Sequence, residues 1–175
     1  MHPRIDIYCS EDTDSKFAEQ IKQWAEEIIG SLAVEPPPHR LSIRLFHLID
    51  ELQAFFRQEK ETLGIVSEGE AEFIATHEAW RGDPRIHICA ERTKNLSESV
   101  VLGAVQHELA HALLHGTPEF YTFRYSRHLI AAGETLGLDM QLLPPLVFLA
   151  AIAIKDAVVV RRLAETGFES GQIAL

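Results

Sequence analysis

Features that mark several other protein classes are missing from this 175-residue chain. Basic residues are scarce: 16 Lys and Arg stand against 26 Asp and Glu. The resulting net charge of -10 argues against nucleic acid as a partner, because nucleic-acid binders carry basic patches. Cysteine is scarce too, and the widely separated Cys9 and Cys89 favour free thiols in a reducing compartment over a disulfide framework. No apolar run follows a basic N-terminal patch, so we expect no signal peptide and a cytoplasmic protein.

Long apolar runs, glycine-rich phosphate loops and internal repeats are missing as well. The longest apolar stretch, residues 142–154, is shorter than the roughly 20 residues that span a bilayer. We therefore expect a buried helix there and no membrane partner. The rest of the composition, with 46% hydrophobic and 24% charged residues, is ordinary for a globular protein. The length suits one domain with a substantial core.

The order of the predicted elements indicates an α+β fold. Polar and apolar residues alternate in the expected strands, whereas apolar residues recur at helical spacing in the expected helices. Strands are expected at residues 4–9, 41–48, 71–79 and 85–90, the last two joined as a hairpin, and early helices at residues 13–29 and 50–63. Later helices are expected at residues 96–115, 118–132 and 141–166. We predict one domain over residues 1–175, with a small mixed or antiparallel sheet and two helices over 1–94 and a helical half over 95–175.

The helix expected at residues 96–115 contains the pattern His-Glu-x-x-His, formed by His107, Glu108 and His111. Residues four apart stand one above the other on a helix, with Cβ atoms roughly 6 Å apart, so both imidazoles can bind one metal ion. Zinc accepts such nitrogen ligands at about 2.0–2.1 Å. Glu108 is then placed to take a proton from a metal-activated water. The pattern predicts one catalytic zinc ion per chain.

The surrounding residues favour a helix at this pattern. Asn95 and Glu98 are suited to an N-cap and its N3 partner, and Gly116 begins the exit from the helix. One face of the predicted helix is apolar and is expected to pack on the core; it is formed by Val101, Val105, Leu109 and Ala112. The three histidines His107, His111 and His115 lie on the other side, which suits neither a plain core nor a solvated surface.

The segment at residues 105–116, Val-Gln-His-Glu-Leu-Ala-His-Ala-Leu-Leu-His-Gly, resembles the active-site helix of the zincin metallopeptidases. Within them it is most similar to the minigluzincins and other small microbial metallopeptidases. The resemblance implies a twisted sheet before the active-site helix and a second helix that brings a third zinc ligand. It covers some 12 of the 175 residues. The longer metzincin pattern is not met, because Leu114 and Thr117 stand where a glycine and a third histidine belong.

The third ligand must therefore come from elsewhere in the chain, and Asp156 is the preferred candidate. Asp156 interrupts a long apolar segment, and acidic residues are almost never fully buried without a partner. The alternative is a solvated ion pair of Asp156 with Lys155, Arg161 or Arg162.

Two other residues are weaker candidates for the third ligand. Glu134 lies 23 residues after His111, near the interval found in gluzincins, but flanking glycines favour a loop there. His115 lies about 12 Å along the helix axis from His107, so we expect it to cap the helix C-terminus instead.

The sequence therefore predicts a zinc-dependent hydrolase, specifically a peptidase acting on peptides or proteins. The strand at residues 85–90 is expected to be an edge strand that aligns the substrate. Tyr121, Tyr125 and His128 are candidate hydrogen-bond donors to the reacting oxygen, whereas His77 and His87 are expected to be structural. The alternative function is a non-catalytic, metal-stabilised binding or regulatory module. The sequence leaves substrate specificity and oligomeric state open.

Overall fold

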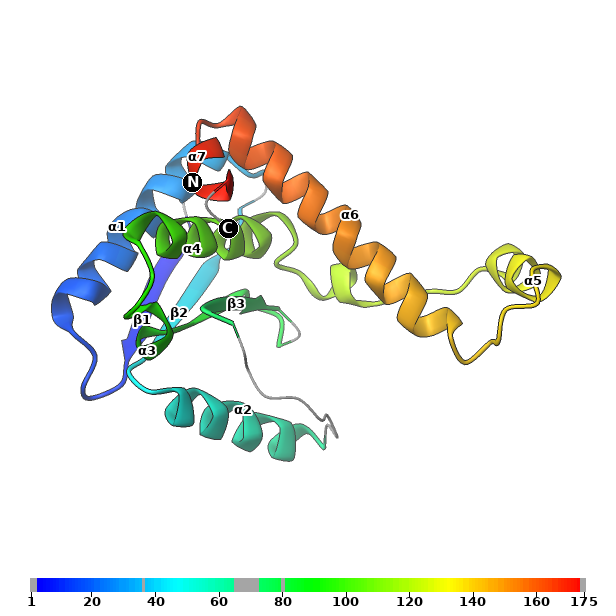
Figure 1. Ribbon diagram of the computed structural model, residues 1–175, viewed down its shortest axis with the longest axis horizontal. Helices are drawn as coiled ribbons and strands as arrows, with labels where there is room; N and C mark the ends of the chain where they lie inside the picture. The colour runs from blue at the N-terminus through cyan, green and yellow to red at the C-terminus, as the bar shows by residue number, and fades with distance from the viewer. Residues whose placement is uncertain (1–2, 36, 65–72, 80, 174–175) are drawn as a thin grey trace.

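The fold is mixed α+β, as predicted, and is organised around a small four-stranded sheet of order β1-β2-β4-β3 (Figure 1). The computed structural model describes residues 3–35, 37–64, 73–79 and 81–173. The four strands are β1 (Arg4–Cys9), β2 (Arg40–Phe46), β3 (Ala75–Glu78) and β4 (Arg85–Cys89). β1, β2 and β4 are parallel neighbours, and β3 is antiparallel to β4.

The predicted hairpin is confirmed, but its edge strand is not the predicted one. β4 lies between β2 and β3, so the expectation that residues 85–90 form the edge strand is wrong. Every residue of β4 is buried, as fits an interior strand covered on both faces. The edge strand on this side of the sheet is β3 instead, a shorter strand that pairs with β4 alone, and β1 is the edge on the other side. Residues 71 and 72 of the predicted strand lie outside the described residues.

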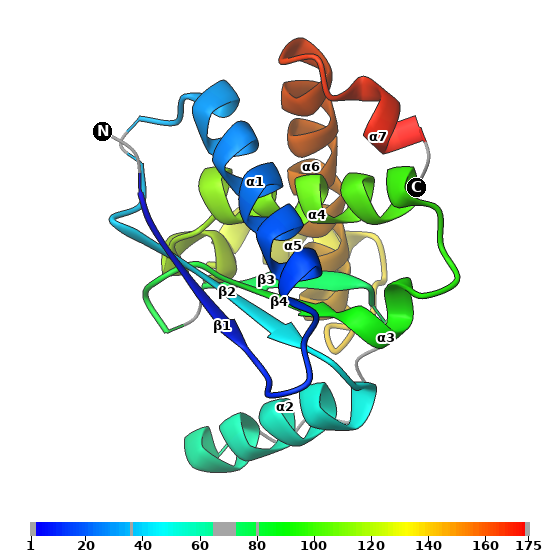
Figure 2. The ribbon, with the colours of Figure 1, turned by 90° about the vertical axis from the view of Figure 1, so that its left-hand side faces the viewer.

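Helices cover both faces of the sheet. α1 (Ser15–Leu32) and α4 (Glu98–Leu114) lie on one face, and α2 (Ile49–Leu63) lies on the other (Figure 2). The four residues of the predicted apolar face of α4 are all buried, which confirms that part of the prediction; they are Val101, Val105, Leu109 and Ala112. On the histidine side of α4, His111 stacks on His77 of edge strand β3.

The remaining helices differ from the prediction at their boundaries. A short separate helix, α3 (Ala90–Thr93), precedes α4. The N-cap of α4 is Ser97, so the N-cap prediction for Asn95 is wrong. After α4 the chain forms η1, α5, α6 and a terminal helix α7 that the sequence did not indicate. Their bounds are Pro118–Tyr121, Arg127–Thr135, Leu143–Glu165 and Glu169–Ile173.

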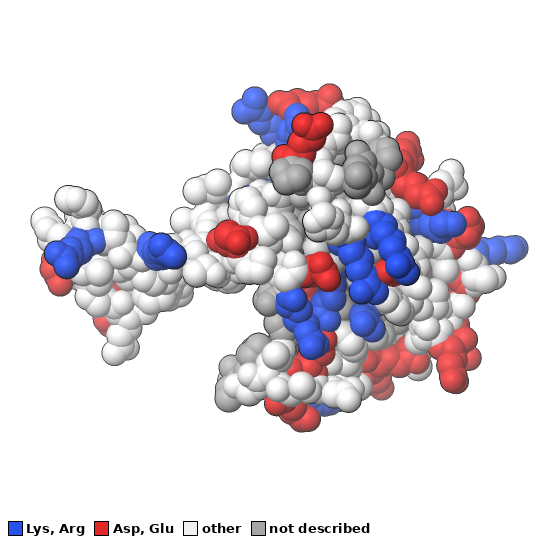
Figure 3. Space-filling model, turned by 180° about the vertical axis from the view of Figure 1, so that it is seen from behind, with Lys and Arg blue, Asp and Glu red and all other residues white. Residues whose placement is uncertain are grey.

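α5 and the first half of α6 form an arm that extends from the body (Figure 1). The prediction that this apolar segment is buried is wrong, because side chains such as Phe148, Leu149 and Ile154 are exposed. Figure 3 shows little charge on the arm between its tip and the body. Among the described residues, α6 is the one helix long and apolar enough to cross a membrane, a test that core helices also pass. Cytoplasmic location and the absence of a membrane partner stay predictions.

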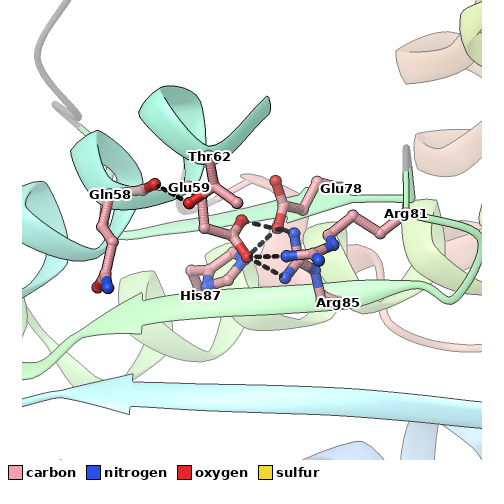
Figure 4. A network of polar contacts seen from close by, with 7 residues as sticks. All are labelled: Gln58, Glu59, Thr62, Glu78, Arg81, Arg85 and His87. Carbon is pink, nitrogen blue, oxygen red and sulfur yellow. Dashed lines mark hydrogen bonds and ion pairs between the residues drawn. The ribbon is translucent and has the colours of Figure 1, made fainter. Parts of the chain in front are cut away.

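A buried ionic network attaches the hairpin to α2 (Figure 4). Arg85 on β4 donates two hydrogen bonds to Glu59 on α2, at 2.7 and 2.8 Å, and is also paired with Glu78 on β3. Burial would raise the pKa of Glu59, but hydrogen bonds from Arg85 and Arg81 outweigh it and lower that pKa. Since successive strand residues face opposite sides of a sheet, anchoring Glu78 beside α2 directs His77 toward α4.

Candidate metal centre

The two histidines of the motif converge on one point beside α4. His107 and His111 are one helical turn apart, and their Nε2 atoms lie 3.1 Å from each other. His111 is buried and His107 is partly buried. The helix places both residues on one face, because residues four apart are neighbours there.

The second half of α6 brings a carboxylate to the same point. Asp156 Oδ1 lies 3.0 Å from His111 Nε2 and 4.0 Å from His107 Nε2. The ligating atoms of these three residues all lie within 4.8 Å of one another, a group that could hold a metal ion. Val159 and Leu163, which are fully buried on the same helix, fix this part of α6 against the core.

Asp156 reaches the site for a reason other than the one that the sequence suggested. Its side chain is 46% exposed, so the argument from full burial in an apolar helix is wrong. α6 packs against α4, and Asp156, in the second half of α6, lies beside the histidines of α4. The tertiary contact, not the surrounding apolar sequence, selects this carboxylate.

The other two candidate ligands are not part of this group. Glu134 is an exposed residue on α5, at the far end of the arm (Figure 1). His115 is buried behind His111, and their Nδ1 atoms are 3.3 Å apart. His115 follows the last residue of α4, as the C-cap prediction required, but its ring contacts His111 and Phe120.

Glu108 is held by a histidine that the sequence analysis treated as structural. His77 Nδ1 lies 2.5 Å from Glu108 Oε2, and the His77 ring stacks on that of His111 with centroids 4.5 Å apart and planes within 3°. His77 therefore lies beside the candidate site, and its structural role stays a prediction. No local pattern could reveal this, because the contact joins edge strand β3 to α4. His87 is fully buried and bonded to Glu78, consistent with a structural role.

The site keeps its central imidazoles neutral. Burial, together with the neighbouring His77 and His107, lowers the pKa of His111 to about 2. Burial and the nearby Lys155 lower the pKa of His115 to about 4. Both rings are therefore uncharged near neutral pH, which is the state in which an imidazole binds a metal.

Tyr121 and Lys155 lie near the same group of residues. The Tyr121 hydroxyl is buried and has no hydrogen-bond partner among the described residues. Burial and the charges of Glu108 and Glu78 raise the pKa of Tyr121 to about 12, so its hydroxyl keeps its proton. Lys155 Nζ lies 4.5 Å from the centroid of the Tyr121 ring. Two other predicted donors are exposed: Tyr125, just before α5, and His128, on α5.

Comparison of the chain with protein-family models, with curated proteins and with solved structures finds no match.

Proposed function

We propose that this protein is a zinc-dependent hydrolase, and specifically a peptidase, with Glu108 as the general base. The observation that carries the proposal is the convergence of His107, His111 and Asp156 around one point, with Glu108 on the same helix. A metal site with three protein ligands is typical of catalytic zinc, which keeps one position open for water or substrate.

The donor set and its spacing both suit zinc. Two imidazole nitrogens and one carboxylate oxygen are ligands that zinc prefers. Zinc bonds of about 2.0–2.1 Å at tetrahedral angles place neighbouring ligand atoms about 3.3–3.4 Å apart. The three separations here, 3.1, 3.0 and 4.0 Å, lie around that value. When bound, zinc would lower the pKa of a water molecule and polarise the substrate carbonyl.

The protein's own part in the reaction is to move protons and orient groups. The Glu108 carboxylate accepts a proton from the attacking water and returns it to the leaving amine. Since a carboxylate only accepts hydrogen bonds, His77 donates its Nδ1 proton to Oε2 and fixes the Glu108 side chain. The buried Tyr121 hydroxyl, protonated and without a partner among the described residues, is the proposed donor to the substrate oxygen.

Edge strand β3 is the proposed guide for an extended peptide. It carries His77, whose ring reaches Glu108, and its outer side pairs with no other strand of the described sheet. A peptide that paired with β3 would run beside the metal group. A sheet with an antiparallel edge strand, followed by an active-site helix and a second helix bearing a ligand, is the layout that the zincin resemblance implied.

The alternative, a non-catalytic module stabilised by metal, predicts a closed site with four protein ligands. The group found in the described part of the chain has three. The adjacent Glu108 also weighs against that alternative, because a structural zinc has no use for a second carboxylate at its side.

Cleavage of peptides tests the proposal directly. The zinc-loaded protein is incubated with a diverse mixture of unstructured peptides, and mass spectrometry identifies new termini against a chelator-treated control. We expect cleavage that requires zinc. A protein that binds one zinc ion and cleaves no peptide would instead support the non-catalytic module.

Replacing His77 with phenylalanine is expected to lower kcat about tenfold while leaving zinc bound. This is less than the roughly 10²–10⁴-fold that a positioned acid–base group contributes, because His77 only orients Glu108. Phenylalanine keeps a ring to stack on His111 but cannot donate to Glu108. Steady-state kinetics and zinc content are measured together. His128→Phe, at an exposed position on α5, is the control. An unchanged kcat in His77→Phe would contradict the proposal that His77 positions Glu108.

A further inference from the structure

The C-terminal helix α7 contacts the candidate metal centre through His107. Gln172 Oε1 on α7 lies 2.9 Å from Nδ1 of His107, the ring nitrogen that does not face His111. The amide group of Gln172 also donates from Nε2 to the carbonyl oxygen of Gly103, at 3.3 Å. Gln172 therefore joins the backbone of α4 to one of its own histidines.

These two contacts fix the protonation of His107. The Gly103 carbonyl can only accept, so it selects the nitrogen end of the Gln172 amide and turns the oxygen toward His107. Since that oxygen can only accept as well, Nδ1 of His107 carries the proton. The lone pair is then on Nε2, the atom that lies beside His111 and Asp156.

Close packing of α7 against α4 brings Gln172 to His107. A Cβ atom at Gly171 would lie 3.2 Å from the Cα of Gly103 and 2.4 Å from Oε1 of the buried Gln106. Glycine at both facing positions, Gly103 and Gly171, lets the two backbones approach closely. That close approach brings the side chain of Gln172 within reach of His107.

We propose that Gln172 is a positioning residue for the metal centre: it sets the tautomer and ring orientation of His107 and thereby the zinc affinity. The inference rests on the proposed function of the same site. Histidine ligands are commonly held through their second ring nitrogen, and loss of such a partner lowers metal affinity by about 10–100-fold. His115 has the corresponding place behind His111, with Nδ1 facing Nδ1 at 3.3 Å.

Gln172 and His115, the outer partners of the two histidines, are both neutral groups. Replacing Gln172 with a charged residue therefore tests the proposal. A carboxylate in place of the Gln172 amide would accept the same hydrogen bond from His107 and make that ring a stronger ligand, but it would no longer donate to the Gly103 carbonyl. Gln172→Ala should bind zinc about tenfold more weakly than the parent protein, whereas Gln172→Glu, which still accepts from His107, should bind it more tightly than Gln172→Ala. A residue with only a packing role would not distinguish these two variants in this way.

Zinc affinity is measured by competition with a chromogenic chelator for the parent protein, Gln172→Ala and Gln172→Glu. Ser170→Ala, at an exposed position on the same helix, is the matched control. The unfolding temperature of each protein is also measured in excess EDTA, to detect any loss of the metal-free fold. We expect the weaker binding of Gln172→Ala without a change in that temperature.

The outcomes separate the two claims. A parent protein that binds no zinc would overturn both the proposed function and this inference. A parent that binds zinc, with Gln172→Ala binding it equally well, would overturn the inference alone. Gln172→Glu that binds as weakly as Gln172→Ala, or a loss of affinity matched by a loss of the metal-free fold, would assign Gln172 a packing role and also overturn it.

Discussion

Glu108→Gln is expected to retain its zinc and to lose peptide hydrolysis. The amide has nearly the same size as the carboxylate, so the histidine ligands on either side of position 108 keep their places on α4. It cannot take a proton from water, however, and a positioned general base contributes about 10²–10⁴-fold to the rate. The measurements are kcat on a peptide cleaved by the parent protein and zinc content of both proteins.

Glu98→Gln is the matched control for Glu108→Gln. Glu98 lies on the same helix, in its first turn, and accepts a hydrogen bond from Gln20 at an exposed position outside the metal group. The control should keep parental activity. Full activity in Glu108→Gln would contradict the assignment of the general base, whatever the zinc content.

Asp156→Ala is expected to lower zinc affinity by at least about 100-fold, because losing a direct ligand should exceed the 10–100-fold loss typical of an outer partner. Its carboxylate is the sole acidic group in the three-residue cluster found among the described residues. The substitution should not disturb the fold, since the side chain is 46% exposed. Chelator competition gives the affinity, and circular dichroism checks the helix content.

Glu134→Gln serves as the comparison for Asp156→Ala, because Glu134 was the second sequence candidate and lies on the exposed arm. It should bind zinc as tightly as the parent protein. The reverse pattern, with Glu134→Gln losing zinc and Asp156→Ala keeping it, would place the third ligand on α5 and contradict the geometry described above.

Local patterns in the sequence predicted the parts of the site that lie within one element. The spacing of His107 and His111 fixes their common face as soon as a helix forms, and the apolar spacing on the other side predicted which face is buried. The β3–β4 hairpin was likewise predictable, because a short turn-rich segment joins two alternating strands.

Contacts between distant elements were beyond those patterns. The pairing of His77 with Glu108 depends on β3, rather than β4, lying at the sheet edge, and sequence periodicity does not give strand order. The contact of Gln172 with His107 depends on a five-residue helix after residue 166 that has no strong pattern of its own. The hydropathy of residues 142–154 predicted a buried helix, but much of this segment of α6 is exposed. Hydropathy describes the side chains themselves and does not tell whether another element covers them.

Asp156 lies in the group that could hold a metal ion, but not for the reason that the sequence suggested. Its place in an apolar segment suggested a fully buried carboxylate that needs a metal partner. The carboxylate is half exposed and reaches His111 because α6 packs on α4 there. Only the folded arrangement distinguishes Asp156 from Glu134, which is equally acidic but lies on the arm.

The metal content of the purified protein, measured by elemental mass spectrometry beside a His107→Ala/His111→Ala double variant, tests the central claim most directly. Our account predicts one zinc ion per chain in the parent protein and none in the double variant. A folded parent protein that holds no metal and takes up none when zinc is supplied would contradict the account, and the cluster of His107, His111 and Asp156 would then be a hydrogen-bonded group without a metal.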